Sequence, residues 1–314
     1  MKKIILANPR GFCAGVERAI EIVEKALEMY GSPVYVKNEI VHNKFVVEEL
    51  RAKGAIFVNQ ISEIPNGSTT IFSAHGVSQK VEDESLLREL FTIDATCPLV
   101  KKVHFEAMRN EREGKQIILI GHAGHPEVEG TAGRLQNQVL LVSNIEEAAT
   151  ILVENQDNLS YVTQTTLSVD DTSQIIKILK DRFVCITGPD TRDICYATQN
   201  RQNAVKKLAS LVDIIFVIGS RKSSNSNRLR DLAEESGIQA FLIDSEHDID
   251  LSVIDNVERI GITAGASAPE ILVENVIAFI SEKYPSVVEN LEGPIENIQF
   301  KLPKQVKAKE EERT

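Results

Sequence analysis

Three of the four cysteines share a sequence context that suits metal binding. Cys13, Cys97 and Cys195 each lie in a short loop directly before a helical pattern. The exposed N–H groups and the positive dipole end of a helix start favour the thiolate, which is the form of cysteine that binds metals. In a compartment that keeps thiols reduced, four cysteines in 314 residues indicate metal binding or catalysis, with inert buried thiols as the alternative.

Cys185 lies in a different context. It falls inside the apolar run of residues 183–186, which predicts a strand, and free cysteine is a common residue of protein cores. We therefore predict that Cys185 serves packing and does not bind a metal.

Three thiolates would suit an iron-sulfur cluster with one open corner. A cubane cluster normally takes four protein thiolates, so three would leave one iron free to bind a substrate oxygen as a Lewis acid. The spacing of the cysteines leaves alternatives open. A zinc site of three cysteines and a histidine is comparably possible, and inert thiols are the commoner state.

Residues 121–130, with the sequence GHAGHPEVEG, place imidazole and carboxylate groups together in a glycine-rich loop. Neither packing nor helix formation demands these groups there. Glu127, close to His125, could deliver a proton to a leaving hydroxyl as a general acid. A solvated loop whose carboxylates face water is an equally good interpretation of this segment alone.

Several other polar residues have simple structural interpretations. His42 and His75 lie at the ends of predicted elements, where a histidine is more often structural than a ligand. Residues 223–227, SSNSN, have the composition of a helix N-cap and also of a phosphate cradle. Ser267 opens a predicted capping box with Glu270. These residues indicate a binding site only if they lie together. Neutral donors and helix ends gathered at one centre would suit a diphosphate.

The elements that would position these residues alternate along the chain. Short β-branched runs alternate with amphipathic helical patterns, which predicts an α/β protein with parallel sheets and helices on both faces. Two series of strand-and-polar-loop units recur about every hundred residues, a spacing suited to small domains. The three units of the first series have their strands at residues 4–7, 117–120 and 214–217. The three units of the second series are residues 71–76, 161–166 and 260–267.

We predict three α/β lobes related by a pseudo-threefold axis, a trefoil around one central site, where the three cysteines could converge. The predicted lobes are residues 1–97 with Cys13 and Cys97, residues 98–192, and residues 193–281 with Cys195, followed by a C-terminal extension and tail at residues 282–314. The charged end from Lys304 to Thr314 is predicted to fray.

Composition excludes some classes of protein. The formal net charge of −11 argues against a sequence-independent nucleic-acid binder, which needs a basic face. No apolar stretch is long enough to span a membrane, and the run at residues 4–7 is too short for a signal peptide. We expect a cytoplasmic protein without nucleic-acid or membrane partners.

Five motifs occur in order along the chain: NPRGFCAGV, DATCPLV, GHAGHPE, TQTTLS and SSNSN, which begin at residues 8, 94, 121, 163 and 223. Together they closely resemble the 4-hydroxy-3-methylbut-2-enyl diphosphate reductase family, and the resemblance runs from residue 3 to about residue 300. It implies a trefoil of three α/β domains around a 4Fe-4S cluster.

The resemblance also implies roles for individual residues. Cys13, Cys97 and Cys195 would hold the cluster, whose fourth iron is open to substrate and easily lost to give a 3Fe-4S form. Glu127 would provide protons, and Thr165 would position the substrate hydroxyl. The residues implied to line the substrate pocket are His42, His75, His125, Thr165, Ser223, Ser224, Asn225 and Ser267.

The implied reaction is the reductive dehydroxylation of an allylic diphosphate to isopentenyl and dimethylallyl diphosphate, with two electrons and two protons. No nucleotide fingerprint is evident in the sequence, so the electrons would come from ferredoxin or flavodoxin. Three rival functions remain at this stage: a dehydratase that needs no reductant, a zinc hydrolase, and a cluster-bearing sensor or scaffold.

Overall fold

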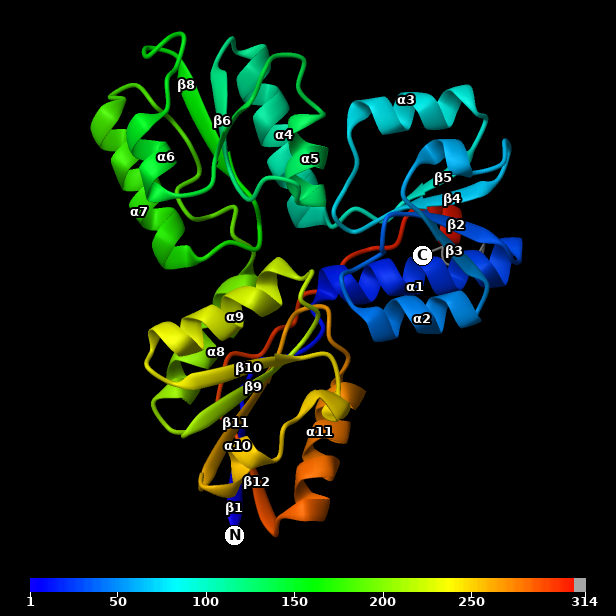
Figure 1. Ribbon diagram of the computed structural model, residues 1–314. Coiled ribbons are helices and arrows are strands. Elements are labelled where there is room, and N and C mark those ends of the chain that lie inside the picture. Colours follow the sequence, from blue (N-terminus) through cyan, green and yellow to red (C-terminus); the bar gives the residue numbers. More distant parts are fainter. Residues whose placement is uncertain (308–314) are drawn as a thin grey trace. The chain divides into compact units, whose positions relative to one another are not determined.

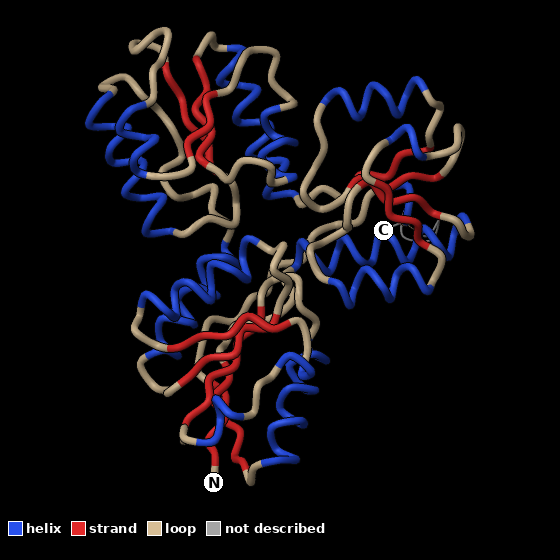
Figure 2. The backbone as a smooth tube through the Cα atoms, in the orientation of Figure 1, coloured by secondary structure: helices blue, strands red, loops and turns tan. Residues whose placement is uncertain are grey.

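The computed structural model describes residues 1–307, and these contain three parallel β-sheets with helices between the strands (Figures 1 and 2). The predicted α/β class is therefore confirmed. The chain divides into two compact units. Unit 1 comprises residues 1–16, 42–46 and 196–299, and unit 2 contains the remaining described residues.

Unit 1 contains a five-stranded sheet with the strand order β10-β9-β11-β1-β12. Ile5 and Ile215 pack against helices on one face of this sheet, while Ile4 and Ile214 pack against helices on the other, as expected for strands buried on both sides. The strands are β1 (Lys2–Leu6), β9 (Ile214–Ile218), β10 (Gln239–Ile243), β11 (Arg259–Ala264) and β12 (Ser286–Asn290). The helices are α8 (Tyr196–Ala209), α9 (Ser224–Glu235), α10 (Ser252–Asp255) and α11 (Glu270–Lys283).

Strand β1 corrects the predicted first lobe. It pairs with β11 and β12, so the N-terminal residues belong to the sheet of the lobe that was predicted to begin at residue 193. The apolar run predicted the strand itself correctly. Its partners lie more than 250 residues away along the chain, a pairing that local sequence patterns do not encode.

Unit 2 contains two smaller sheets. The first has the order β3-β2-β4-β5, and the second has the order β7-β6-β8. The first comprises β2 (Val34–Lys37), β3 (Ala55–Val58), β4 (Thr69–Phe72) and β5 (Phe91–Asp94), with helices α1 (Ala14–Tyr30), α2 (Lys44–Ala52) and α3 (Gln79–Leu87). The second comprises β6 (Gln116–Ile120), β7 (Leu140–Val142) and β8 (Leu159–Thr163), with α4 (Pro98–Arg112), α5 (Pro126–Ala132), α6 (Ile145–Thr150) and α7 (Val169–Arg182).

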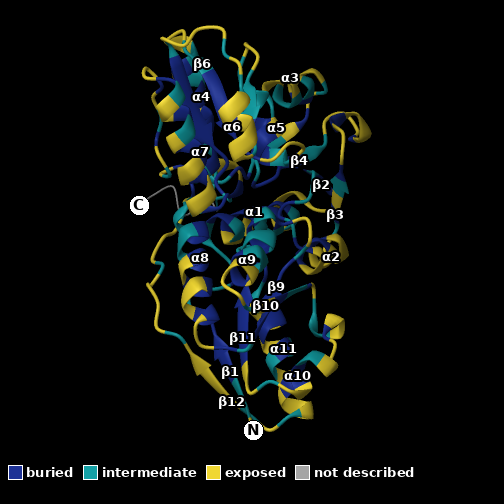
Figure 3. Ribbon diagram, turned by 60° about the vertical axis from the view of Figure 1, so that its left-hand side comes forward, coloured by how far each residue is buried: buried dark blue, intermediate teal, exposed yellow. Residues whose placement is uncertain are grey.

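Burial in the second sheet of unit 2 follows its two faces. Ile117 and Leu119 pack with residues of α4 and α5, whereas Ile118 and Ile120 pack with residues of α6 and α7. Figure 3 shows buried strands between helices whose outer sides are exposed. Both faces are thus covered, which leaves the strand ends as the places where polar loops gather.

The C-terminal segment differs from the predicted frayed tail where it is described. Val306 is fully buried, and the carbonyl of Gln305 accepts a hydrogen bond from the Tyr30 hydroxyl at 2.5 Å. Burial of Val306 and this bond fix a segment that its charged composition alone predicted to be loose. Residues 308–314 of the predicted tail lie outside the described residues. Within residues 1–307, no helix combines the length and apolar character needed to cross a membrane.

Candidate functional site

The three candidate ligand cysteines lie at helix starts, as predicted. Cys97 is the N-cap residue of α4, and Cys13 and Cys195 directly precede α1 and α8. All three are half-buried, and none forms a disulfide. The dipole ends of three helices of 14 to 17 residues therefore favour negative charge on these sulfurs.

Each of these cysteines is fixed by the same backbone contact. The N–H of Cys97 donates to the carbonyl of Ala74 at 3.0 Å, and the N–H of Cys195 donates to that of Thr165 at 3.0 Å. The N–H of Cys13 donates to Ala266 at 3.3 Å. Every acceptor lies two residues beyond the end of a strand, namely β4, β8 and β11. The second predicted series of strand-and-loop units thus carries one cysteine contact per repeat.

Cys185 was wrongly predicted to be a core residue of a strand. It is exposed, and Val184 beside it is 94% exposed. The N–H of Ile186 donates to the carbonyl of Phe183 at 3.2 Å, so the run makes a turn after α7. Only the first and last residues of the run are buried, a spacing of three that belongs to a turn.

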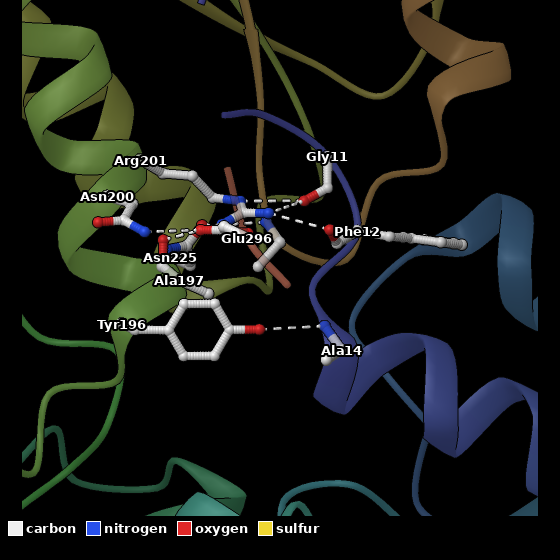
Figure 4. A network of polar contacts seen from close by, with 10 residues as sticks. Gly11, Phe12, Ala14, Tyr196, Ala197, Asn200, Arg201, Asn225 and Glu296 are labelled. Atoms are coloured by element: carbon white, nitrogen blue, oxygen red, sulfur yellow. Dashed lines mark hydrogen bonds and ion pairs between the residues drawn. The ribbon is translucent and has the colours of Figure 1, made fainter. Parts of the chain in front are cut away.

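Arg201 holds the loop that carries Cys13 (Figure 4). Its side chain is fully buried and donates to the carbonyl of Gly11 at 2.7 Å and to that of Phe12 at 2.9 Å. The carboxylate of Glu296 lies 3.2 Å from the same guanidinium. Burial raises the pKa of the Cys13 thiol, and the positive charge of Arg201 opposes this shift. Arg201 could not be identified from the sequence, because arginines in helices are usually solvated.

Gly11 allows the turn that precedes Cys13. Its φ of +65° lies in the left-handed region, and a Cβ atom there would approach the carbonyl oxygen of Ala268 to 3.2 Å. A side chain at this position would be strained and crowded. Glycine is therefore required where the Cys13 loop passes the loop that follows β11.

The SSNSN segment caps α9, as the simpler interpretation predicted. The Ser223 side chain accepts a hydrogen bond from the N–H of Ser226 at 3.3 Å. Asn225 is 3% exposed, and its Oδ1 accepts from the N–H of Ala266 at 3.1 Å. Within residues 1–307 its buried Nδ2 has no hydrogen-bond partner. An unsatisfied buried donor at the N-terminus of a helix is well suited to an anionic ligand.

Ser267 does not form the predicted capping box. Helix α11 begins at Glu270 with Pro269 as its N-cap, and no side chain caps it. The Ser267 hydroxyl instead donates to the carbonyl of His42 at 3.0 Å. Glu270 pairs with Arg10 at 2.5 Å. In unit 1 the predicted pocket residues Ser267 and His42 are therefore in direct contact.

Glu127 and Thr165 form the central polar contact of unit 2. The carboxylate accepts from the backbone N–H of Thr165 at 2.6 Å and from its hydroxyl at 3.0 Å. Glu127 is only 2% exposed, and burial raises its pKa to about 7. The negative charge of Asp193 acts in the same direction, while the two Thr165 bonds oppose it. A carboxyl group with such a pKa can hold and release a proton near neutral pH.

His125 is the N-cap of α5. Its Nδ1 accepts a hydrogen bond from the N–H of Glu127 at 3.2 Å, which leaves Nε2 to carry the proton of the neutral ring. The ring of His75 meets that of His125 edge to face, with centroids 5.9 Å apart. His75 Nδ1 lies 3.4 Å from the Ser73 hydroxyl. Two predicted pocket histidines are thus neighbours within unit 2.

Two further buried groups escaped the sequence interpretation. The Asp193 carboxylate accepts from the N–H of Thr163 at 3.2 Å and pairs with Lys102 at 3.3 Å. His104 is buried, and burial lowers its pKa to about 4, so its ring is neutral at physiological pH. The position of Asp193, two residues before Cys195, was the one feature of the sequence that could have indicated its role. His104 lies within an ordinary helical pattern and has no such feature.

Comparison with known proteins identifies the family. The LytB protein family matches residues 4–281. A protein of Histophilus somni is 55% identical over 313 residues, covering 99% of this chain and 100% of its own length. One of Rhodopseudomonas palustris is 56% identical over 300 residues, covering 96% and 98%. They are named 4-hydroxy-3-methylbut-2-enyl diphosphate reductase and 4-hydroxy-3-methylbut-2-enyl diphosphate reductase 1.

Solved structures support the same family assignment. The structure of the E-1-hydroxy-2-methyl-but-2-enyl-4-diphosphate reductase from Plasmodium falciparum superimposes with a TM-score of 0.94 at 39% identity, covering 97% of this chain and 96% of the other. A second reductase structure, described as the terminal enzyme of the non-mevalonate pathway, gives a TM-score of 0.63 at 33% identity, covering 90% of this chain and 100% of the other. This chain therefore belongs to the LytB protein family.

Proposed function

We propose that this chain reduces 4-hydroxy-3-methylbut-2-enyl diphosphate to isopentenyl and dimethylallyl diphosphate. Relatives with this name match nearly the full length of the chain at about 55% identity. The reaction replaces an allylic C–O bond by a C–H bond, takes up two electrons and two protons, and releases water. The observation that carries the proposal is the buried Glu127–Thr165 pair, which can supply a proton to the leaving oxygen.

We propose Cys13, Cys97 and Cys195 as ligands of a 4Fe-4S cluster. The donor set fits such a cluster, because each cysteine lies outside any disulfide, is half-buried and is placed at a helix start. When bound, the cluster would supply single electrons and a Lewis-acidic corner. Within residues 1–307, no three or more histidine, cysteine or carboxylate side chains form a group that could hold a metal ion. The assignment of the three cysteines therefore depends on their motifs and on their positions at helix starts.

The protons in the proposed reaction pass through Glu127. Its raised pKa keeps much of the carboxyl group protonated at neutral pH, so it can act as an acid. The Thr165 hydroxyl lies 3.0 Å from that carboxyl and can pass a proton on, donating one while it accepts another. The leaving hydroxyl would depart as water.

The diphosphate would be held by neutral donors. The unpartnered Nδ2 of Asn225, at the start of α9, is the donor with the best-defined geometry. Ser267 and His42, which contact each other, would add donors in unit 1. Ser223, Ser224, His75 and His125 complete the proposed pocket. Helix N-termini and amide donors bind phosphate oxygens without the strong field that many lysines would impose.

The electron source and the cellular compartment complete the proposal. The electrons come from a separate one-electron carrier of the ferredoxin or flavodoxin type, because the sequence has no evident nucleotide fingerprint. The protein works in the cytoplasm, where low-potential carriers and reduced thiols are available.

An anaerobic turnover assay tests the proposal. Protein with bound cluster is given 4-hydroxy-3-methylbut-2-enyl diphosphate and chemically reduced methyl viologen, and the products are identified by mass spectrometry. We expect isopentenyl and dimethylallyl diphosphate, two viologens oxidised per product, and no turnover without reductant. Conversion without reductant would instead support a dehydratase. A zinc-containing, iron-free protein would support a hydrolase, and an iron-containing protein without turnover would support a sensor.

A further inference from the structure

Helix α4 presents an exposed face of aromatic and basic side chains. An open hollow of about 720 Å³ runs along it. Phe105, at its centre, is 61% exposed, and the one acid among the lining residues is Glu106. Together with Phe105, the remaining lining residues recur at spacings of three or four along α4, with Lys101 directly beside Lys102, and this places them on one helix face. They are Pro98, Lys101, Lys102, Arg109 and Arg112.

The charge of this face opposes that of the chain. The formal net charge is −11, yet four of the seven residues that line the hollow are basic. Lys101 and Lys102 pair with the carboxylates of Asp94 and Asp193, at 2.6 and 3.3 Å. Arg109 and Arg112 lie exposed farther along the helix. Basic groups around an exposed aromatic ring suit an acidic protein partner.

The same face adjoins the segments that carry two of the proposed ligands. Pro98 directly follows Cys97, the N-cap of α4. Lys102 donates to the carbonyl of Arg192 at 3.3 Å and pairs with Asp193, two residues before Cys195. All of these residues belong to unit 2. A protein seated on α4 would therefore come close to both cysteine loops.

We infer that this face of α4 is the docking surface for an acidic one-electron carrier protein. The inference rests on the proposed function. At each encounter one reduced carrier is oxidised and gives up one electron, and two encounters supply the two electrons that accompany two protons in each turnover. The basic side chains steer the carrier, and Phe105 supplies the apolar contact at the centre of the surface.

The test compares electron delivery by two carrier proteins with electron delivery by a small dye. Arg109→Glu and Phe105→Ala are prepared with cluster bound, and Lys177→Glu, at an exposed position of α7, is the control. Turnover is measured with reduced flavodoxin, with reduced plant-type ferredoxin and with methyl viologen, and the affinity for each oxidised carrier is measured by calorimetry at low and high salt. For the α4 variants we expect affinities lowered about tenfold at low salt, with viologen-driven turnover unchanged. Lys177→Glu should behave as the wild type.

The outcomes separate this inference from the proposed function. If the α4 variants bind both carriers as tightly as the wild type does, or if the wild type binds neither, the docking surface is wrong. If the wild type gives no product even with methyl viologen, the proposed function is wrong. Loss of viologen-driven turnover in the α4 variants alone would show damage to the site and would also count against docking.

Discussion

The backbone N–H of Cys195 donates to the carbonyl oxygen of Thr165 at 3.0 Å, while the N–H and hydroxyl of Thr165 bind the carboxylate of Glu127. One loop after β8 therefore fixes both a proposed cluster ligand and the proposed proton donor. The same backbone contact recurs at the other two cysteines with Ala74 and Ala266. This repeat gives the three helix starts equivalent local surroundings.

Replacing any one of Cys13, Cys97 or Cys195 with serine should lower the iron content of anaerobically purified protein to a small fraction of the wild-type value, because a cubane cluster with two thiolates is poorly held. Iron and sulfide analysis measures this directly. Cys185→Ser is the matched control, since Cys185 lies exposed on a turn, and its iron content should be unchanged. Loss of iron in the Cys185 variant would refute the choice of ligands.

Glu127→Gln should lower kcat by roughly two orders of magnitude or more, the usual contribution of a general acid. The amide preserves the size of the side chain and an acceptor for the N–H of Thr165, so iron content and substrate affinity should stay near those of the wild type. Viologen-driven turnover, iron analysis and calorimetry with the substrate measure the three quantities. Near-normal kcat would exclude Glu127 from the mechanism.

The pH dependence of the wild type should carry the signature of Glu127. Its pKa is raised to about 7, so the acid form is lost, and kcat should fall, as pH rises through about 7. A folded-state pKa above the unfolded value of 4.5 also stabilises the fold below pH 4.5, and this contribution is lost as pH rises through about 7. The wild type should therefore lose stability relative to Glu127→Gln across this range. Parallel pH curves for the two proteins would contradict the raised pKa.

Asn225→Asp should raise the KM for the diphosphate at least tenfold and change kcat much less. The substitution retains an oxygen that can accept from the N–H of Ala266, but it replaces the unpartnered Nδ2 donor with an acceptor that repels phosphate. Steady-state kinetics separate the two constants. An unchanged KM would remove Asn225 from the diphosphate site.

Arg201→Met should destabilise the protein by about 3–5 kcal/mol, because it removes the fully buried guanidinium and leaves the mostly buried carboxylate of Glu296 with only the Asn200 amide as a partner within residues 1–307. The carbonyls of Gly11 and Phe12 also lose their donor, so iron content should fall as the Cys13 loop loosens. Arg259→Met is the control, since that side chain is 51% exposed in its pair with Asp213 and should cost about 1 kcal/mol or less. Urea unfolding measures both, and equal costs would contradict the proposed role of Arg201.

The sequence predicted those parts of the fold and site that depend on local patterns. Helical spacing and the residues before each helix located Cys13, Cys97 and Cys195 correctly at helix starts. The short apolar run around Cys185 has no clear period, and a turn was mistaken for a strand. The pairing of β1 with β11 and the burial of Arg201 depend on residues far apart in the chain. Such contacts leave no trace in local periodicity.

The most direct test of the central claim is Mössbauer spectroscopy on anaerobically purified, iron-57-labelled protein, with and without 4-hydroxy-3-methylbut-2-enyl diphosphate. A cluster with three thiolate ligands predicts one iron site that is distinct from the other three and changes when the substrate is added. A protein without an iron cluster would contradict the proposed site and its chemistry. So would four equivalent irons whose Mössbauer signals do not change when the substrate is added.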